Sequence, residues 1–591
     1  MKDPEYNLLD EPWIPIRLLD GTITNVGLLE LVERTSDIAD LACELPTQNI
    51  AIQRLILAIA YRVATPSNEQ EWARQWNEGA PTDRMLEYLE EWRDRFYLFG
   101  GRYPFMQVAD LRTEKDAVSG LEKIIADVPN GEQFFTTRHG KALANISAAE
   151  AARWLIHAQA YDPSGIRSGA VGDSQVKGGK GYPIGPSWCG HLGIVWLKGE
   201  NLDESLVLNL VPSDSGNLRG VSTSTQWGGC TWEDDEPETA ERGDYSLLDS
   251  AGTPQPISIP RLLTWHSRRV RLAGDVSGVT GVVLAQGDKL APQQMQQYEP
   301  LSLWCYSKGQ SQKFKQDVYM PNEFESERAL WRNLPGILPG EMEIEGADKR
   351  LKDKFFPSAT LLFHYGFDMS GVKIAYPKRM RIQAVGVVYG PKKSTFEDIY
   401  FDELMMPVAL MPAENHECDK NSTQMDKRNE KLKELYNTVN EQVRTTENVA
   451  RILGTLAANL ARAAGETRAA GESGDRAGDG ARDRAKQHFY ARVDDPFRHW
   501  LVNIDGESEP SEIAQIWKRS LRAFAQEAAA ELVASTPSSA IIGRYILRKT
   551  DRDIRRDPNR VFMNVGIAEN YFNSELNKLL PIQENTQEGT K

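Results

Sequence analysis

The chain has 591 residues, 40% of them hydrophobic, and a formal net charge of −15. This length allows two or more domains with a large buried core, and 14 tryptophans are typical of an ordered globular protein. The acidic balance argues against a surface coated with nucleic acid, although it leaves room for local basic loops.

Composition also bounds the class of protein. No apolar run approaches the roughly 18 residues that a membrane span needs. The first residues are acidic and lack an apolar signal core, so we expect a cytoplasmic protein. The five cysteines are scattered and form no Cys-x-x-Cys pair. We therefore expect no structural zinc site, no disulfide framework and no cofactor.

Residues 6–17 open the chain with a dense aromatic and proline phrase. Pro12 and Pro15 bracket Trp13 and Ile14, which disfavours both a long helix and a central strand. We expect an extended edge segment with Trp13 buried as an anchor.

Three helices are predicted in the first part of the chain. Residues 40–64 are mostly apolar and should be buried. Residues 84–99 have aromatic residues near helical spacing and end at two glycines. Residues 147–160 begin with a serine that can cap a helix, and Trp154 and Leu155 should face inward.

From there to about residue 400, short β-like runs are separated by long irregular stretches. Helices and strands do not alternate regularly, so we predict an α+β fold with a large, irregular mixed α/β domain over 1–405. Long connections inside a compact domain usually serve function or a partner. The predicted strands are 193–197, 206–211, 268–272, 280–284 and 379–389.

The chain becomes helical after about residue 405. Helices are predicted over 424–466, 481–503, 511–535 and 538–556 from apolar residues at helical spacing. An Ala/Gly/Asp/Arg-rich connector over 467–484 has little to bury. These elements predict a C-terminal four-helix bundle over 406–591.

The sequence contains none of the strong catalytic motifs. There is no Gly-x-x-x-x-Gly-Lys-Ser/Thr phosphate loop, no His-Glu-x-x-His zinc motif and no Gly-x-Ser-x-Gly nucleophile elbow. The 84 carboxylates make chance acid–base pairs inevitable. An enzyme is therefore disfavoured but stays open.

Residues 163–190 form the strongest loop signal, with eight glycines and three basic residues. Glycine lets backbone N–H groups approach another molecule closely, and such groups can bind phosphate or a shallow groove. The alternative is a flexible surface loop.

Residues 386–394 form the second signal. A predicted strand ends in a Gly-Pro turn that presents Lys392 and Lys393. A rigid turn with a cationic tip suits insertion at a nucleic-acid duplex. The alternative is an ordinary solvated hairpin tip.

The last predicted helix carries a basic stripe. Arg544, Arg548, Arg552 and Arg556 recur at four-residue steps, so they would share one helix face and could track a phosphate backbone. The alternative is intrahelical pairing with neighbouring aspartates. Residues 541–560 contain seven basic and three acidic residues.

Two adjacent aromatics, Phe134 and Phe135, lie in the polar, glycine-flanked stretch 130–140. An exposed aromatic in a loop often contacts a partner or stacks on a base. The alternative is that they are core residues.

Taken together, these features resemble the CasA family, the large subunit of the type I-E CRISPR surveillance complex called Cascade. The resemblance covers most of the chain, in order and spacing. It rests on 6–17, 103–107, 149–161, 206–210, and on His488, Phe489, Tyr490, Phe497, Trp500 and Leu501.

This resemblance implies a noncatalytic subunit that recognises the protospacer-adjacent motif (PAM) of double-stranded DNA through the minor groove. Such subunits help to start unwinding and R-loop formation, while the guide RNA reads the remaining sequence. They also present a docking surface to a helicase–nuclease. Their other partners are the guide RNA 5′ handle and the backbone, handle-binding and small subunits.

The resemblance also implies roles for particular residues. The family's loop that docks on the guide handle and neighbouring subunits matches 120–146, with Phe135 at its tip. The lysine finger matches Lys289, and the wedge turn matches Pro391, Lys392 and Lys393. Some members have glutamine at the wedge, which leaves the preferred motif open. The family's minor-groove glycine loop matches Gly165, Ile166, Arg167, Ser168 and Gly169.

Two other functions stay open. One is a nucleotide- or phosphate-processing enzyme that uses the 163–190 loop, which a strand entering the loop and a helix leaving it would favour. The other is a scaffold without direct DNA contact. A separate irregular loop near Lys392 would favour DNA recognition.

Overall fold

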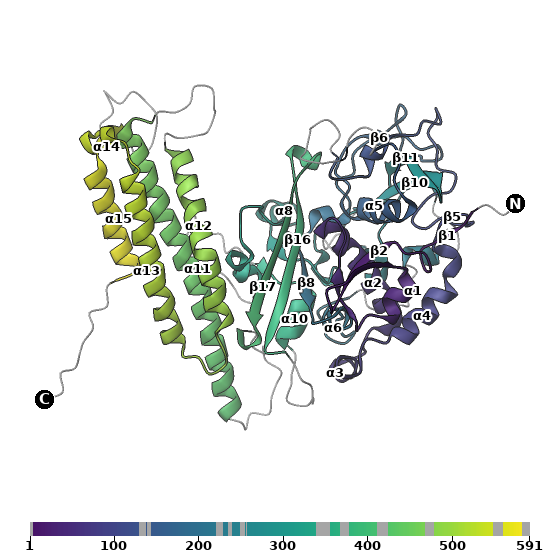
Figure 1. Cartoon of the computed structure of the whole chain (residues 1–591), viewed down its shortest axis with the longest axis horizontal. Coiled ribbons are helices and arrows are strands. Elements are labelled where there is room, and N and C mark those ends of the chain that lie inside the picture. The colour runs from purple at the N-terminus through teal and green to yellow at the C-terminus, as the bar shows by residue number, and fades with distance from the viewer. Residues whose placement is uncertain are drawn as a thin grey trace. The chain divides into compact units, whose positions relative to one another are not determined.

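The computed structural model describes residues 4–128, 138, 143–219, 228–234, 239–246, 248, 254–255, 257–338, 355–366, 377–410, 423–466, 478–547 and 560–581. The chain forms two compact units, the first up to Leu404 and the second from Met405 (Figure 1). The first unit mixes helices with small sheets, and the second is mainly helical, as the predicted fold class requires.

The helices of the first unit are short apart from two. They are α1 (Leu28–Glu33), α2 (Pro46–Ala64), α3 (Glu69–Glu78), α4 (Thr82–Glu91), α5 (Ala148–Tyr161), α6 (Leu202–Leu208), α7 (Ile259–Leu263), α8 (Lys308–Phe314), α9 (Leu334–Ile337) and α10 (Ala359–Gly366).

Most strands of the first unit are also short. They are β1 (Tyr6–Asn7), β2 (Ile14–Leu18), β3 (Ile23–Val26), β4 (Ile38–Leu41), β5 (Tyr97–Phe99), β6 (Arg167–Ser168), β7 (Lys180–Gly181), β8 (Ile194–Lys198), β9 (Asp244–Tyr245), β10 (Arg268–Asp275), β11 (Gly278–Gln286), β12 (Lys289–Leu290), β13 (Trp304–Tyr306), β14 (Tyr319–Pro321), β15 (Phe355–Phe356), β16 (Arg379–Tyr389) and β17 (Phe396–Pro407).

These strands build several small sheets rather than one large one. Strands β3, β2 and β4 form an antiparallel sheet in that order, and β17, β16 and β8 form another. Strands β10 and β11 form a long hairpin. The predicted strands 193–197, 268–272, 280–284 and 379–389 are confirmed.

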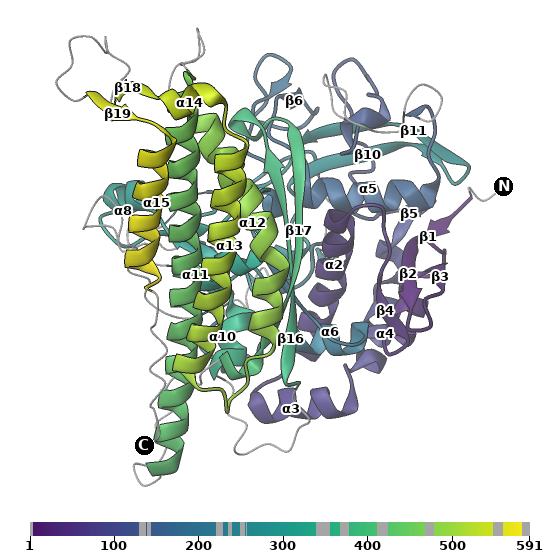
Figure 2. The same cartoon turned by 60° about the vertical axis from the view of Figure 1, so that its left-hand side comes forward.

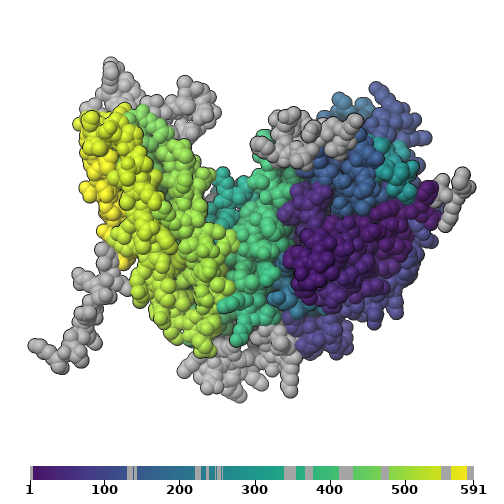
Figure 3. All heavy atoms as spheres, viewed as in Figure 1, coloured from purple at the N-terminus to yellow at the C-terminus, as the bar shows by residue number. Residues whose placement is uncertain are grey.

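The opening phrase provides an anchor, as predicted, although not an edge strand. Trp13 is 1% exposed, and its indole Nε1 donates to the carbonyl of Leu8 at 2.8 Å. Strand β2 lies between β3 and β4, so the predicted edge position is wrong. Pro15 is accommodated because pairing with β4 begins only at Ile16. Figure 3 shows the N-terminal segments, in purple, forming part of the surface of the first unit.

The predicted helices of the first unit are largely confirmed. Helix α5 begins as predicted: the Ser147 side chain accepts from Glu150 N, and Trp154 and Leu155 are fully buried. Helix α2 starts only at Pro46, because β4 precedes it and pairs with β2. Helix α4 ends at Glu91, since the following aromatic residues form β5 and pair with β1.

The predicted strand over 206–211 is wrong, because the first half of this apolar run is the end of helix α6 and the second half is not in a strand. Asn201 caps that helix by accepting from Glu204 N at 2.9 Å, and the acidic first turn suits a helix N-terminus.

The second unit contains α11 (Thr423–Ala464), α12 (Asp479–Val502), α13 (Pro510–Ala534), α14 (Ser538–Ile542), β18 (Arg544–Leu547), β19 (Arg560–Met563) and α15 (Val565–Leu579). Helix α11 packs against α12, α13 and α15, which run beside it in Figure 2. The buried Trp517 of α13 donates to Thr446 Oγ1 of α11 at 3.0 Å. The helical character is confirmed, and the specific four-helix bundle stays a prediction.

The helix predicted over 538–556 is wrong over 543–547, and 548–556 lie outside the described residues. Gly543 has a φ of +76°, which ends α14, and Arg544 begins strand β18, which pairs with β19. The Arg544 guanidinium donates to the carbonyls of Ala463 and Ala464 at the end of α11. The predicted single-face stripe therefore does not include Arg544. Its other members, Arg548, Arg552 and Arg556, lie outside the described residues.

Candidate functional site

The predicted glycine loop, residues 163–190, runs from the end of α5 to the 3-10 turn Trp188–His191 that precedes β8. A helix therefore enters the loop, and a short turn followed by a strand leaves it. A phosphate-binding loop needs the opposite order, with a helix N-terminus after the loop. Within the loop, β6 and β7 form a small antiparallel pair. This element order gives the enzyme alternative no support.

A buried charge cluster holds the base of this loop. Asp162 accepts from Arg268 Nε at 2.5 Å and from Arg167 Nη2 at 2.7 Å. Arg268 is 0% exposed, and its other N–H groups donate to the carbonyls of Pro163 and Gly185. Burial lowers the pKa of Arg268, while the Asp162 carboxylate opposes that shift. The first and last parts of the loop are thus attached to β10.

Strand β11 is attached to the same loop. The side chain of Gln286 donates from Nε2 to the carbonyl of Gly165 at 2.8 Å and to that of Gly181 at 3.4 Å. Lys289 follows three residues later in β12, which pairs in parallel with β9. The Lys289 ammonium is 3.7 Å from Asp244 and the side chain is 39% exposed. The predicted lysine finger is therefore near the loop and partly paired.

The glycines of the predicted minor-groove segment differ in their surroundings. Gly169 N donates to Gly179 O at 3.0 Å, and an added Cβ would lie 2.6 Å from Val176 Cγ1. The absence of a side chain there serves packing inside the loop. Ile166 is 56% exposed, and Ser168 is also exposed. The Arg167 side chain is mostly covered and bound to Asp162.

The predicted turn with two lysines connects β16 to β17 as a 3-10 turn, Pro391–Lys393. Lys392 and Lys393 both have left-handed backbone angles, with φ of +59° and +54°. Gly390 N donates to Thr395 O at 3.0 Å, which closes the turn. Lys392 is exposed. The Lys393 ammonium instead lies 2.6 Å from Glu323 Oε1 and donates to Gly190 O at 3.2 Å.

A direct hydrogen bond joins the glycine loop to this turn. Ser164 N donates to Lys393 O at 2.8 Å, although the two residues are far apart in the sequence. Figures 1 and 2 both show β6 near the end of the β16–β17 hairpin. The structure thus brings together the predicted segments around Gly165 and Lys392. Phe134 and Phe135 lie outside the described residues, so their predicted contacts stay predictions.

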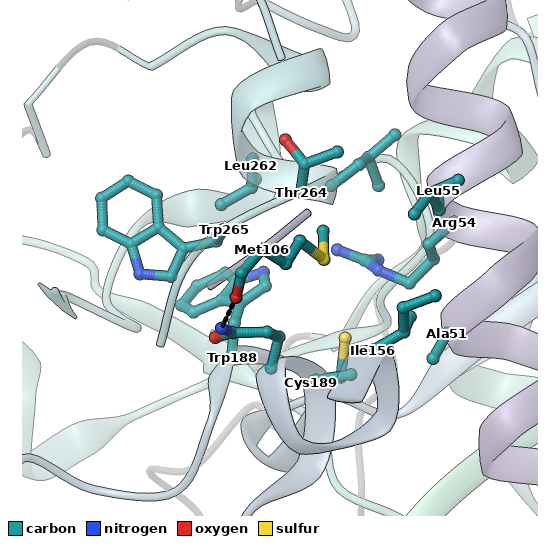
Figure 4. Close-up of a pocket in the computed structure, with 13 residues that line it drawn as sticks. Ala51, Arg54, Leu55, Met106, Ile156, Trp188, Cys189, Leu262, Thr264 and Trp265 are labelled. Carbon is teal, nitrogen blue, oxygen red and sulfur yellow. Dashed lines mark hydrogen bonds between the residues drawn. The ribbon is translucent and has the colours of Figure 1, made fainter. Parts of the chain in front are cut away.

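The 188–191 turn, at the end of the glycine loop, is fixed to the core of the first unit. Arg54 of α2 forms two hydrogen bonds with Glu299, at 2.7 and 2.9 Å, and both side chains are buried. Trp188 Nε1 donates to the same carboxylate at 2.8 Å. Figure 4 shows Arg54, Trp188 and Cys189 around a pocket of about 20 Å³, room for little more than a water molecule. Burial raises the pKa of the Cys189 thiol to about 12, as expected of a structural cysteine.

Among the described residues, no group of three or more His, Cys, Asp or Glu side chains is arranged to hold a metal ion. In the same part of the chain, every helix is too short or too polar to cross a membrane.

Comparison with known proteins identifies the family. A family model described as CRISPR-associated protein Cse1 matches residues 7–528. The chain belongs to the Cse1 family. The predicted resemblance to the CasA family is thereby confirmed.

Known Cse1 structures share this fold. The crystal structure of Thermobifida fusca Cse1 has 35% sequence identity, 98% coverage of both chains and a TM-score of 0.79. A curated CasA/Cse1 from Thermus thermophilus is 29% identical over 377 residues, which span 59% of this chain and 66% of that relative. A chain of a CRISPR RNA-guided surveillance complex has 16% identity, coverage of 98% and 99%, and a TM-score of 0.64, a likeness of fold.

The residues that assemble this site in the Cse1 chain were not all found from sequence. Asp162, Arg268, Gln286 and Glu323 make the contacts that hold the loops, and none of them was predicted. Asp162 and Arg268 lie 106 residues apart, so no local pattern marks their pairing. A polar residue in a largely apolar strand, as at Gln286 in β11, is an available signal. Strand β10 carries three arginines, so its sequence does not single out Arg268.

Proposed function

We propose that this Cse1 chain is the noncatalytic large subunit of an RNA-guided type I-E surveillance complex. The family membership and the likeness to a chain of a CRISPR RNA-guided surveillance complex support this role. Its partners would be the guide RNA 5′ handle, the other Cascade subunits and a recruited helicase–nuclease.

Within that complex, the chain recognises the PAM in double-stranded DNA through the minor groove and starts duplex opening. The observation that carries this proposal is the Ser164–Lys393 hydrogen bond, which keeps a loop with exposed Ile166 and Ser168 beside a turn with exposed Lys392. A loop that enters a groove and a turn that wedges the base stack must act at neighbouring base pairs, and this contact keeps them adjacent.

The chemistry of the site is suited to weak sequence discrimination at a few base pairs. The minor groove offers a degenerate pattern of acceptors and one donor, so backbone groups and Lys289 would discriminate weakly. Opening costs roughly 1.4 kcal/mol per base-pair step. A wedge therefore needs to stabilise only the first opened step until the guide RNA pairs with the target strand.

The test is DNA binding by the reconstituted complex that carries Lys392→Ala together with Lys393→Ala. We expect a larger loss of affinity for an intact duplex than for a target opened in advance beside the PAM. Equal losses on both substrates would contradict the wedge. Unchanged binding to both would favour a scaffold without DNA contact, and nucleotide or DNA hydrolysis by the isolated chain would favour an enzyme.

A further inference from the structure

The two lysines of the 391–393 turn occupy different environments. Lys392 is exposed, and no hydrogen bond or ion pair of its ammonium occurs among the described residues. The Lys393 side chain is 28% exposed, lies 2.6 Å from the Glu323 carboxylate and donates to Gly190 O. The Lys392 ammonium is thus available to a ligand, whereas the Lys393 ammonium is already bound within the protein.

The carboxylate that binds Lys393 belongs to a well-anchored segment. Asn322 N donates to the carbonyl of Leu303 at 2.8 Å, and the Phe324 ring stacks on Tyr400 with centroids 4.5 Å apart. Glu323 lies between these two anchors. Gly190, the second partner of Lys393, belongs to the 188–191 turn that Trp188 fixes to the core. The Lys393 ammonium therefore connects the turn to two rigid parts of the first unit.

The backbone conformation of the 391–393 turn requires contacts that hold it in place. Both lysines have left-handed backbone angles, which a residue with a side chain adopts only when its surroundings impose them. The Lys393 carbonyl must also stay in place to accept from Ser164 N. The contacts of Lys393 satisfy both needs, because they fix the residue at its backbone and at the end of its side chain.

We propose that Lys393 is a positioning residue, that its ion pair with Glu323 holds the 391–393 turn in shape, and that Lys392 is the lysine of this turn that meets the DNA. This inference rests on the proposed function in DNA opening. It assigns separate roles to two residues that the sequence predicted to act alike.

Glu323→Gln gives the most direct test, because the two possibilities predict opposite signs. If Lys393 met the DNA itself, removal of a neighbouring carboxylate would free its charge and strengthen duplex binding. If Lys393 positions the turn, the same change loosens the turn and slows opening. We expect R-loop formation on an intact duplex to slow by about fivefold, the upper range for a partly exposed ion pair.

The experiment uses the reconstituted complex with Lys392→Met, Lys393→Met, Glu323→Gln and the double variant Lys393→Met/Glu323→Gln. Rates are measured on an intact target and on one opened beside the PAM, at several salt concentrations. Lys431→Met is the matched control, since Lys431 forms a 2.8 Å ion pair with Glu509 at a similar exposure of 29%. Thermal unfolding checks that each variant is folded.

We expect Lys392→Met to weaken duplex binding and to reduce the salt slope by about one. Lys393→Met and Glu323→Gln should slow opening of the intact target, leave the opened target unaffected and keep the salt slope. The double variant should be no slower than Lys393→Met alone, because both changes remove one interaction. Faster opening by Glu323→Gln, or a salt slope that falls with Lys393→Met, would overturn the inference.

The same data separate this inference from the proposed function. If Lys392→Met impairs duplex binding while Lys393→Met and Glu323→Gln match the control, the inference fails and DNA recognition stands. If all four variants behave as the wild type on both targets, DNA contact by this turn fails, and the inference fails with it.

Discussion

At the scale of single residues, Arg268 is the side chain on which the candidate site most depends. It is fully buried and joins Asp162 to two loop carbonyls. Removal of one partner of a buried ion pair is strongly destabilising. Asp162 would keep its contact with Arg167, but the carbonyls of Pro163 and Gly185 would lose the donor that Arg268 provides. We expect Arg268→Met to lower the free energy of unfolding by about 3–5 kcal/mol, measured by urea denaturation.

A double-mutant cycle with Asp162→Asn separates pairing from packing. The combined loss in Arg268→Met/Asp162→Asn should be smaller than the sum of the single losses, since each change breaks the Asp162–Arg268 pair. Additive losses would show that Arg268 acts through its packing. Arg519→Ala, an exposed arginine in α13, provides the control.

His157 of α5 gives the first unit a pH-dependent stability. It is 1% exposed, and its Nε2 lies 2.9 Å from Thr47 Oγ1. Burial lowers the pKa of His157 from 6.5 to about 3, while Asp162 opposes this shift. The unfolded chain therefore binds more protons between these values. The stabilisation is complete above pH 6.5 and is lost as the pH falls toward 3.

Between pH 7 and pH 5, this residue alone should lower the free energy of unfolding by about 2 kcal/mol. His157→Gln keeps a polar group near Thr47 but has no side chain that can be protonated in this pH range. The free energy of unfolding of this variant should therefore fall by about 2 kcal/mol less than that of the wild type between pH 7 and pH 5. Urea denaturation at both pH values measures the difference. His488→Gln, at an exposed histidine of α12, is the control for replacing a histidine by glutamine.

At the scale of secondary structure, the end of α11 depends on a distant strand. Arg544 of β18 donates to the carbonyls of Ala463 and Ala464, in the last turn of α11, where a helix leaves its C=O groups without intrahelical donors. We expect Arg544→Ala to destabilise this end by about 1 kcal/mol. Hydrogen exchange should become faster in the last turn of α11 and stay unchanged near Thr446. If Arg544→Ala changed the exchange rates by the same factor throughout α11, this role would be contradicted.

The helices and strands that were predicted correctly are marked by patterns in their own residues. The apolar run of β16 and the serine cap of α5 needed no information from elsewhere, and both predictions are confirmed. The run 206–211 was misassigned because a short apolar segment has no visible period, although the cap at Asn201 was available as a signal. The helix over 538–556 failed at Gly543, whose left-handed backbone ends α14.

The candidate site was predicted less completely than the elements. The sequence indicated the loops that carry Gly165, Lys289 and Lys392, because glycine, proline and lysine mark such loops locally. It did not indicate Glu323 or Arg268, which hold these loops through contacts with distant segments. The division between Lys392 and Lys393 depends on such contacts, so it required the structure.

At the scale of the whole molecule, the charge distribution predicts weak nonspecific binding. The chain has a net charge of −15. Of the four cations predicted for the site, Arg167, Lys289 and Lys393 each lie within 4 Å of a carboxylate, whereas Lys392 forms no ion pair with any residue that the structure describes. Few counterions would therefore be released from DNA on contact.

We expect the isolated chain to bind duplex DNA of random sequence with a salt slope of about −2, far from the value of about −10 of a heavily basic protein. Fluorescence anisotropy at increasing salt measures this slope. A value steeper than about −5 would show that cations outside the candidate site dominate the contact.

The pairing of β8 with β16 has a consequence for synthesis of the chain. Arg381 pairs with Lys198, so the ribosome adds 183 residues (381 − 198) before the two strands can meet. At about 5–20 residues per second this takes roughly 10–40 s. Ile194 and Trp196 are fully buried in the folded protein, but during this time they lack the neighbouring strand β16. The nascent chain should thus be a substrate for ribosome-associated chaperones until β16 emerges.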